Sequence, residues 1–231
     1  MKMYSKVIAS SFAKVGTQTI GKSLKGLKCE HAQSIIRMEP MIKQPNQLLM
    51  CGIRNFVDRN MSYFFQTCCD DVFNDVRCSS NDFKGEYCFI GSRDVVLKKT
   101  TEELIALFKN SKLHDTPTAW FHDFFNMVDF DYKNQTFDKE LGYQLYTLKN
   151  GNDLMLYRLD SLNDLIEKSP LFKGIVNDNI GNKKWYKEKY KDFKDEIIFD
   201  KKYLENQLNN DIMNFFYTEE EIKSFKNKYR V

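Results

Sequence analysis

One short stretch, Lys14-Val15-Gly16-Thr17-Gln18-Thr19, decides the predicted fold. It follows the apolar segment Val7 to Ala9 and precedes Ile20 to Leu27, a segment that we predict as a helix. A glycine-bearing loop between a strand and a helix can point backbone N–H groups at a phosphate or sulfate, and the helix dipole adds positive charge. Lys14 adds a full charge. We therefore predict an α/β protein that binds an anionic nucleotide at this loop.

The loop fits two patterns of phosphate binding. Residues 16–23 match G-x-x-x-x-G-K-[ST], the loop of ATP- and GTP-binding proteins, with Lys22 as its lysine. The second pattern begins at Lys14, where a lysine precedes the glycine and threonine hydroxyls follow it. The ATP pattern also needs an aspartate after an apolar strand to hold magnesium. Asp160 is available, although the segment before it is also predicted as the second arm of a hairpin.

A second apolar segment ends in an arginine. We predict a strand over Gln47 to Ile53, with Arg54 directly after it and Ser62 eight residues further on in the next helix. The planar guanidinium group of arginine grips phosphate with two hydrogen bonds. The competing interpretation is a structural ion pair between Arg54 and Asp58.

Further segments carry a resemblance to a known family. Residues 179–187, NIGNKKWYK, are similar to the Asn…Lys-Trp-Tyr-Arg signature of a sulfotransferase-like bacterial family of capsular polysaccharide synthesis proteins. Trp120-Phe121, Gly142-Tyr143 and the ending Phe216 to Ile222 also look like that family. The resemblance covers nearly the whole chain.

The resemblance implies transfer of a sulfuryl group from 3′-phosphoadenosine 5′-phosphosulfate (PAPS) to a hydroxyl group of a carbohydrate, such as a capsular or other surface glycan. It implies that Arg54 and Ser62 clamp the 3′-phosphate, with Lys184 as a further cation, and that no metal takes part. Five residues would hold the 5′-phosphosulfate: Lys14, Gly16, Thr17, Gln18 and Thr19. Lys14 would also be catalytic, because it follows the charge on the leaving phosphate.

Transfer to a hydroxyl group needs a general base, and histidine titrates near neutrality. His31 follows the first predicted helix, where related carbohydrate sulfotransferases place histidines near the acceptor, so we assign it this catalytic role. Glu30 is the alternative, and His122 in an aromatic segment is the next candidate. Trp120 and Trp185 could stack on a sugar ring, although aromatic packing is their more common role.

Composition sets the size and class of the protein. With 231 residues, 42% hydrophobic and 14% aromatic, the chain can bury the core of one α/β domain over residues 1–231. We predict three layers, with a short central parallel sheet between helices in a P-loop-like fold, and an insertion at residues 77–98. The net charge of +3, from 35 basic and 32 acidic residues, does not indicate nucleic-acid binding.

The remaining patterns bear on metal sites and location. The six cysteines form no C-x-x-C pair and the chain has three histidines, so we expect reduced thiols and no zinc site. No segment has the roughly 20 apolar residues that cross a bilayer, and the N-terminus lacks the pattern of a signal peptide. We expect a cytoplasmic protein. Two alternative functions remain open, a P-loop kinase or NTPase and a nucleotide-binding protein without catalysis.

Local patterns predict several further elements. We expect a strand over 32–38, a long helix from Val57 to about Asp75, and a hairpin of residues 142–148 and 153–159 joined by Asn150-Gly151. The predicted helix caps are Thr101, Ser161 with Asp164, and Thr218 with Glu221.

Overall fold

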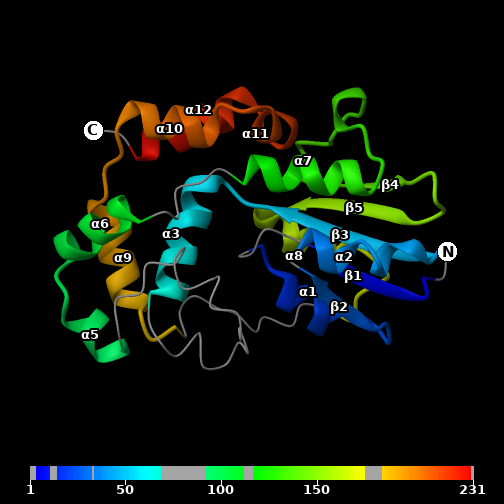
Figure 1. The fold of residues 1–231 in the computed structure, drawn as a ribbon, viewed down its shortest axis with the longest axis horizontal. Helices are drawn as coiled ribbons and strands as arrows, with labels where there is room; N and C mark the ends of the chain where they lie inside the picture. Colours follow the sequence, from blue (N-terminus) through cyan, green and yellow to red (C-terminus); the bar gives the residue numbers. More distant parts are fainter. Residues whose placement is uncertain are drawn as a thin grey trace.

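The structure, a computed structural model, describes residues 4–10, 15–32, 34–68, 92–111, 117–174 and 184–229. Figure 1 shows a central sheet with helices on both faces, a group of helices beyond the carboxyl ends of the strands, and the C-terminal helices along one side. Lys14 and most of the predicted insertion at 77–98 lie outside the described residues.

The described sheet has five strands in the order β2-β1-β3-β5-β4. Their bounds are β1 (Lys6–Ser10), β2 (Cys29–Ala32), β3 (Gln47–Ile53), β4 (Tyr143–Thr147) and β5 (Asp153–Arg158). The first four strands in this order run parallel, and β4 pairs with β5 in the antiparallel direction. The α/β class with a central sheet between helices is confirmed, but the sheet is mixed and not wholly parallel. The tight Asn150-Gly151 turn, with Gly151 at φ +83°, forces β4 to run back along β5.

The order of the strands creates a switch point between β1 and β3. The chain pairs β2 with one side of β1 and then β3 with the other side, and Ser10 of β1 lies opposite Cys51 of β3. The carboxyl ends of β1 and β3 are therefore neighbours. In open α/β sheets, ligands bind in the crevice outside the strand ends at such a point.

The described helices lie between the strands and after them along the chain. Their bounds are α1 (Thr17–Ser23), α2 (Ile35–Met38), η1 (Met41–Lys43), α3 (Phe56–Thr67), α5 (Arg93–Lys98), α6 (Thr101–Asn110), α7 (Thr118–Met127), η3 (Tyr132–Asn134), η4 (Leu159–Ser161), α8 (Leu162–Lys168), α9 (Lys187–Glu196), α10 (Lys201–Leu208), α11 (Asp211–Phe216) and α12 (Glu219–Lys228).

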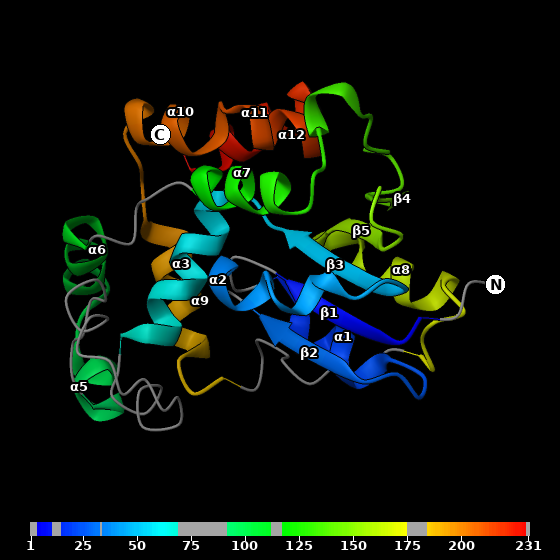
Figure 2. The ribbon, with the colours of Figure 1, turned by 45° about the vertical axis from the view of Figure 1, so that its right-hand side comes forward.

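Alternating residues of the buried strands face two separate cores. On one face, Ile8, Leu49 and Leu156 pack with residues of α2, α3 and α7. On the other face, Leu48 and Tyr157 pack with residues of α1 and α8. Figure 2 shows α2 and α7 on one side of the sheet and α1 on the other. Both faces of β3 are covered, which explains why its sequence is an uninterrupted apolar segment.

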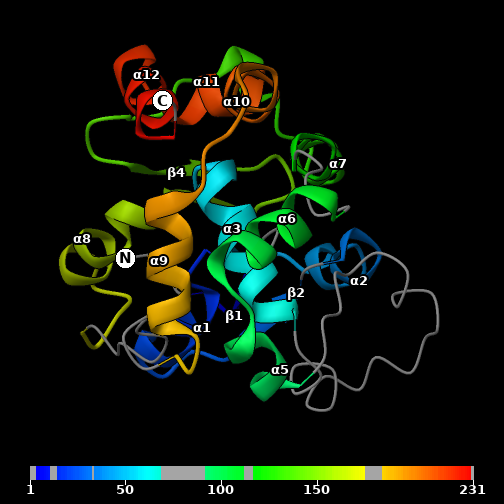
Figure 3. The same cartoon turned by 90° about the vertical axis from the view of Figure 1, so that its left-hand side faces the viewer.

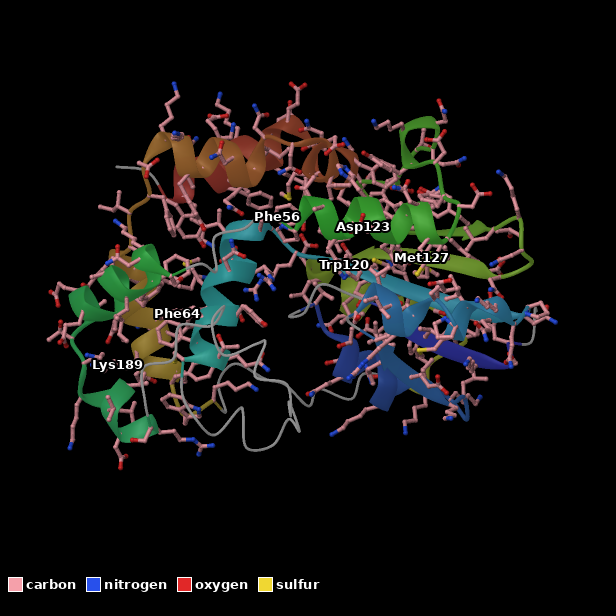
Figure 4. All side chains as sticks on the ribbon, viewed as in Figure 1. Phe56, Phe64, Trp120, Asp123, Met127 and Lys189 are labelled. Carbon is pink, nitrogen blue, oxygen red and sulfur yellow. The ribbon has the colours of Figure 1, made fainter. Side chains whose placement is uncertain are left out.

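Aromatic side chains hold the helices that lie beyond the strand ends. Phe64 and Phe65 of α3, Phe108 of α6 and Phe193 of α9 have ring centroids 5.1–5.9 Å apart. Figure 3 shows α3, α6 and α9 side by side, and Figure 4 labels Phe64 among them. Such pairs contribute roughly 0.5–1.5 kcal/mol each beyond the burial of their area. This cluster fixes α9 against α3, a contact that matters for the site.

Several local predictions are confirmed. The hairpin of β4 and β5 forms as expected, and Thr218 and Glu221 make both hydrogen bonds of a capping box at the start of α12. The cap of α6 is Thr100 and not Thr101, because Thr100 bonds reciprocally with Glu103. Ser161 precedes α8 but makes no capping hydrogen bond, so that predicted cap is wrong.

Three predicted element boundaries differ from the structure. The strand expected over 32–38 is wrong, because β2 ends at Ala32 and Ile35–Met38 forms α2. Ile35 and Met38 face the core while Ile36 is exposed, a spacing of three that suits a helical turn. The first helix spans Thr17–Ser23 and not 20–27, since Leu24 is extended and pairs with Phe172. Helix α3 ends at Thr67, and residues 69–75 lie outside the described chain.

Candidate functional site

The glycine loop is described from Val15 onward, and it differs from the prediction because residues 17–19 already belong to α1. Gly16 has φ +82° and stands directly before α1, a conformation that favours glycine. A Cβ atom there would lie 2.4 Å from Cδ2 of Leu162, so no other residue fits without movement. The first hydrogen bond within α1 runs from Ile20 N–H to Gly16 O (3.1 Å). The earlier N–H groups of the first turn have no partner inside the helix.

The predicted ligand side chains of the loop differ in their access to solvent. Thr17 is half-buried, Gln18 is exposed, and Thr19 is buried on the inner side of α1. Lys22 is exposed in the last turn of α1. Residues 17–23 are helical, whereas the ATP pattern requires residues 16–22 to form the loop that precedes a helix. The geometry of residues 17–23 therefore does not fit the ATP pattern.

Tyr157, which the sequence did not mark as a site residue, connects this loop to the neighbouring strands β3 and β5. The hydroxyl of Tyr157 in β5 donates to Val15 O (2.9 Å), and its fully buried ring crosses Gly52 of β3. A Cβ atom on Gly52 would lie 2.4 Å from Cζ of Tyr157. The signal in the sequence was the glycine inside an apolar strand, which marks the close approach of another group. The hydrogen bond from Tyr157 holds Val15, directly before Gly16, next to the end of β3.

Arg54 directly precedes α3, at the carboxyl end of β3, whereas Ser62 lies in the middle of that helix. Asn55 caps α3, and its Oδ1 accepts hydrogen bonds from Val57 N–H (2.9 Å) and Asp58 N–H (3.2 Å). Arg54 is half-buried and close enough to Asp58 to lower the pKa of that carboxyl. Ser62 is one turn beyond Asp58 on the same helix face. No contact among the described residues joins Arg54 to Ser62, so the clamp stays a prediction.

Arg54 does not form the ion pair with Asp58 that was the alternative to phosphate binding. Asp58 pairs instead with Lys194 (3.0 Å) and Lys228 (3.6 Å), and its Oδ1 accepts a hydrogen bond from the hydroxyl of Tyr229 (2.6 Å). Burial raises the pKa of Asp58, but Lys194 and the other partners outweigh it and lower the pKa overall. Within the described part of the chain, no hydrogen bond or ion pair of 4 Å or less engages Arg54.

Lys184 is not brought to the other predicted ligands by any contact within the described residues. It lies half-buried in the turn before α9, and its carbonyl group accepts from Lys187 N–H (3.1 Å). Its neighbour Trp185 packs edge-on against Tyr186, so the aromatic-packing interpretation of that tryptophan is the one the geometry favours.

His31 lies on the edge strand β2, on the α1 side of the sheet. Its Nε2 is 3.9 Å from Sγ of Cys29, and a Cβ atom on Gly21 would lie 3.0 Å from the same nitrogen. Burial lowers the pKa of His31, which favours the neutral imidazole that a general base requires. Glu30 forms ion pairs with Lys28 (2.9 Å) and Lys6 (3.4 Å), so it is engaged elsewhere.

His122 belongs to a different region. Its Nε2 lies 2.9 Å from Oδ2 of Asp211 and 3.1 Å from the hydroxyl of Tyr132, which itself donates to Asp211. His122 and Tyr132 border an open cavity of about 460 Å³ next to Phe130. The cavity is lined by residues of α7 and of the segment that follows it. Helix α7 covers the face of the sheet opposite to α1 (Figure 1). Trp120 on α7 stacks on Phe124, with centroids 5.3 Å apart.

Comparisons of the chain with protein-family models, with curated proteins and with solved structures find no significant match. Among the described residues, no group of three or more His, Cys, Asp or Glu side chains is arranged to hold a metal ion. No helix in the described ranges has the length and apolar character needed to cross a membrane. Cys29, Cys51 and Cys68 are free thiols.

Proposed function

We propose that the chain is a sulfotransferase with a P-loop-like fold, which moves a sulfuryl group from PAPS to a hydroxyl group of a carbohydrate. One observation carries this proposal. The glycine loop leaves β1 and Arg54 leaves β3, and these two strands are parallel neighbours at the switch point of the sheet. Two anion-binding features therefore open at one edge, as a donor with phosphate groups at its 5′ and 3′ positions requires.

The chemistry of sulfuryl transfer suits this arrangement. The acceptor oxygen, the sulfur and the leaving oxygen must lie in line, and negative charge develops on the leaving phosphate. By analogy with phosphoryl transfer, positioning and charge stabilisation supply most of the rate. The N–H groups after Gly16 and the charge of Lys14 would stabilise the leaving group, while Arg54 and Ser62 would hold the 3′-phosphate. The carbohydrate acceptor rests on the resemblance to the capsular polysaccharide family.

Two observations favour PAPS over a magnesium complex of ATP as the donor. The residues of the ATP pattern are helical, and Lys22 is in the last turn of α1. Asp160, the carboxylate that would hold magnesium, lies 3.4 Å from Nε of Arg158, so an arginine competes with a metal ion for it. The free thiols of Cys29, Cys51 and Cys68 suit a reducing compartment such as the cytoplasm.

Transfer of labelled sulfate from PAPS to a panel of oligosaccharides tests the proposal. We expect turnover by the wild-type protein, a loss of about 100-fold or more in Lys14→Ala, and near-normal activity in Lys22→Ala. Phosphate transfer from ATP that needs magnesium and Lys22 would support the kinase alternative. Nucleotide binding without any transfer would support the catalytically silent alternative.

The role of His31 as the general base has its own test. We expect His31→Ala to lower kcat by about 10²–10⁴-fold. The acidic limb of the pH–rate profile, which reports the protonation of the base, would disappear in this variant. An unchanged profile would assign the base to another group, with His122→Ala as the next variant to measure.

A further inference from the structure

Three polar side chains form a hydrogen-bonded group where α11 packs against α7. Nε2 of His122 in α7 lies 2.9 Å from Oδ2 of Asp211, the first residue of α11. The hydroxyl of Tyr132 donates to the same carboxylate oxygen, and its ring stacks on that of His122 with centroids 5.9 Å apart. Figure 1 shows α11 beside α7. We call His122, Tyr132 and Asp211 the histidine cluster.

The carboxylate of Asp211 determines which nitrogen of His122 carries the proton. Burial raises the pKa of Asp211, but hydrogen bonds from Tyr132 and His122 outweigh it and lower the pKa overall, so the carboxylate is ionised near neutral pH. An ionised carboxylate only accepts hydrogen bonds, and Nε2 must therefore be the protonated nitrogen. In the neutral imidazole Nδ1 is then the acceptor. Within the described part of the chain, no hydrogen bond reaches Nδ1, so it can accept one from a ligand.

The histidine cluster borders a cavity through His122 and Tyr132. The cavity has a volume of about 460 Å³, within the range of small-molecule sites. Its other lining residues are Phe125, Asn126, Asp129, Phe130, Asp131 and Lys133. The two phenylalanines supply apolar wall, and the other side chains supply polar groups.

The cavity and the glycine loop lie at opposite edges of the sheet. Asp129 in the cavity wall pairs with Lys149 of the β4–β5 turn (2.8 Å), and this turn leads into the amino end of β5. The glycine loop follows the carboxyl end of β1, and β1, β3 and β5 are parallel. The cavity is therefore separate from the edge that the proposed donor occupies.

The charges around the cavity nearly cancel. The carboxylates are those of Asp129 and Asp131 in the wall and of Asp211 behind His122. The cations are Lys133 in the wall and Lys149, which pairs with Asp129. Three carboxylates and two ammonium groups leave a net charge of −1 when the imidazole is neutral. This balance opposes an anion, and the two lysines oppose a cation with several charges.

The polar groups of the cavity include both donors and acceptors of hydrogen bonds. Nδ1 of His122 and the carboxylate of Asp131 accept, the ammonium group of Lys133 donates, and the amide of Asn126 does both. A hydroxyl group also donates and accepts, whereas an ammonium group only donates and a carboxylate only accepts. A ligand with several hydroxyl groups can therefore satisfy both kinds of partner.

We propose that this cavity binds a neutral polyhydroxyl ligand of the saccharide class, with Nδ1 of His122 accepting a hydrogen bond from one hydroxyl group. The two phenylalanines contact the C–H groups of the ligand, as in other pockets that combine apolar walls with a few polar groups. Asp211 is a positioning residue, because it acts through His122 and does not line the cavity. The inference goes beyond the proposed function and does not depend on sulfate transfer.

Calorimetric titration with neutral saccharides and with an amine tests the class of the ligand. The saccharides are maltose, lactose and N-acetylglucosamine, and the amine is putrescine. We expect at least one saccharide to bind the wild-type protein with a dissociation constant of about 1 mM or lower. Absence of binding by all three saccharides would overturn the inference, and so would tighter binding of putrescine than of any saccharide.

His122→Phe locates the bound saccharide. The new ring can still stack on Tyr132, but it has no nitrogen, so saccharide binding weakens by about tenfold or more. Asp123→Asn is the control for this variant and for the next one, since Asp123 is exposed on the same helix as His122 and does not line the cavity (Figure 4). We expect this control to bind the saccharide like the wild-type protein.

Asp211→Asn tests the positioning role of the carboxylate. Oδ1 of Asp211 accepts a hydrogen bond from Ile212 N–H (3.0 Å), so the carbonyl oxygen of an asparagine stays there and its amide group faces His122. The amide donates to Nε2, the imidazole proton moves to Nδ1, and saccharide binding weakens by about tenfold or more. Nitrogen NMR of the imidazole ring reports the exchanged tautomer, which a merely structural role of Asp211 would leave unchanged.

The variants decide between this cavity and any other saccharide site. The inference is overturned if His122→Phe binds the saccharide like Asp123→Asn, or if a folded Asp211→Asn keeps the wild-type tautomer and affinity. If Asp211→Asn does not fold, His122→Phe and the control decide. Saccharide binding that depends on His122 in a protein that transfers no sulfate would keep this inference and reject the sulfotransferase.

Discussion

Gly52 and Tyr157 provide the sharpest test of how the sheet positions the glycine loop. In Gly52→Ala the new methyl group would stand 2.4 Å from Cζ and 2.5 Å from the hydroxyl oxygen of Tyr157. The ring is fully buried, so it cannot swing into solvent. It must shift within the core, and its hydrogen bond to Val15 O must lengthen or break.

The expected loss of stability follows from these contacts. Overpacking of a core costs about 1–3 kcal/mol. A buried carbonyl group that loses its partner adds roughly 1–3 kcal/mol, so the free energy of unfolding falls by about 2–4 kcal/mol in Gly52→Ala, allowing for partial relaxation. Tyr157→Leu alone costs about 2–4 kcal/mol, because it removes ring atoms from the same space.

The double variant distinguishes a local clash from general damage to the sheet. In Gly52→Ala/Tyr157→Leu the methyl group enters space that the ring has left, so the combined loss is smaller than the sum by at least about 1 kcal/mol. Urea unfolding measures each value, and the slope with denaturant should not change. Losses that add to within about 0.5 kcal/mol would refute the account of Tyr157 as the group that excludes a side chain at position 52.

Three further predictions concern single side chains. Glu221→Ala removes the 2.7 Å partner of Arg158, whose side chain is 8% exposed, and it opens the capping box of α12. The free energy of unfolding should therefore fall by about 2–4 kcal/mol, and a urea midpoint near that of wild type would contradict this. Burial raises the pKa of Asp211, but hydrogen bonds from Tyr132 and His122 lower it overall. The ionised carboxylate of Asp211 therefore stabilises the fold at pH values above its unfolded-state pKa of about 3.9, and this stabilisation is lost as pH falls through the lower pKa of the folded state. In acid-unfolding scans, wild type should lose more stability than Asp211→Asn below about pH 5. Asp129 has φ +51° just after α7, a conformation that glycine adopts more easily, so Asp129→Gly should raise the free energy of unfolding by about 1 kcal/mol. A lower melting temperature would show that the lost ion pair with Lys149 outweighs the relief of backbone strain.

Local chemistry allowed much of the fold to be predicted from the sequence. Gly16 between an apolar strand and a helix, the Asn150-Gly151 turn and the Thr218 capping box each depend on a few adjacent residues, and each forms as expected. The predicted strand over 32–38 failed because two β-branched residues in a short apolar segment suit either structure. Packing of Met38 against the sheet decides for the helix.

The environment of the candidate site was much harder to predict. Tyr157 reaches Val15 across 142 positions of the chain, and Lys194 and Lys228 reach Asp58 from helices that follow it by more than a hundred residues. Their types and spacing give no sign of these contacts, because the contacts depend on how α9 and α12 pack on α3. The basic segment around α9 is typical of a solvated helix face, and its exposed lysines fit that interpretation, whereas Lys194 does not.

Calorimetry with adenosine 3′,5′-bisphosphate and with ATP, each with and without magnesium, tests the central claim most directly. The account predicts tight binding of the bisphosphate without magnesium, and loss of that binding in Arg54→Ala. Binding of ATP that needs magnesium, with no binding of the bisphosphate, would contradict it, and so would bisphosphate binding that Arg54→Ala leaves unchanged.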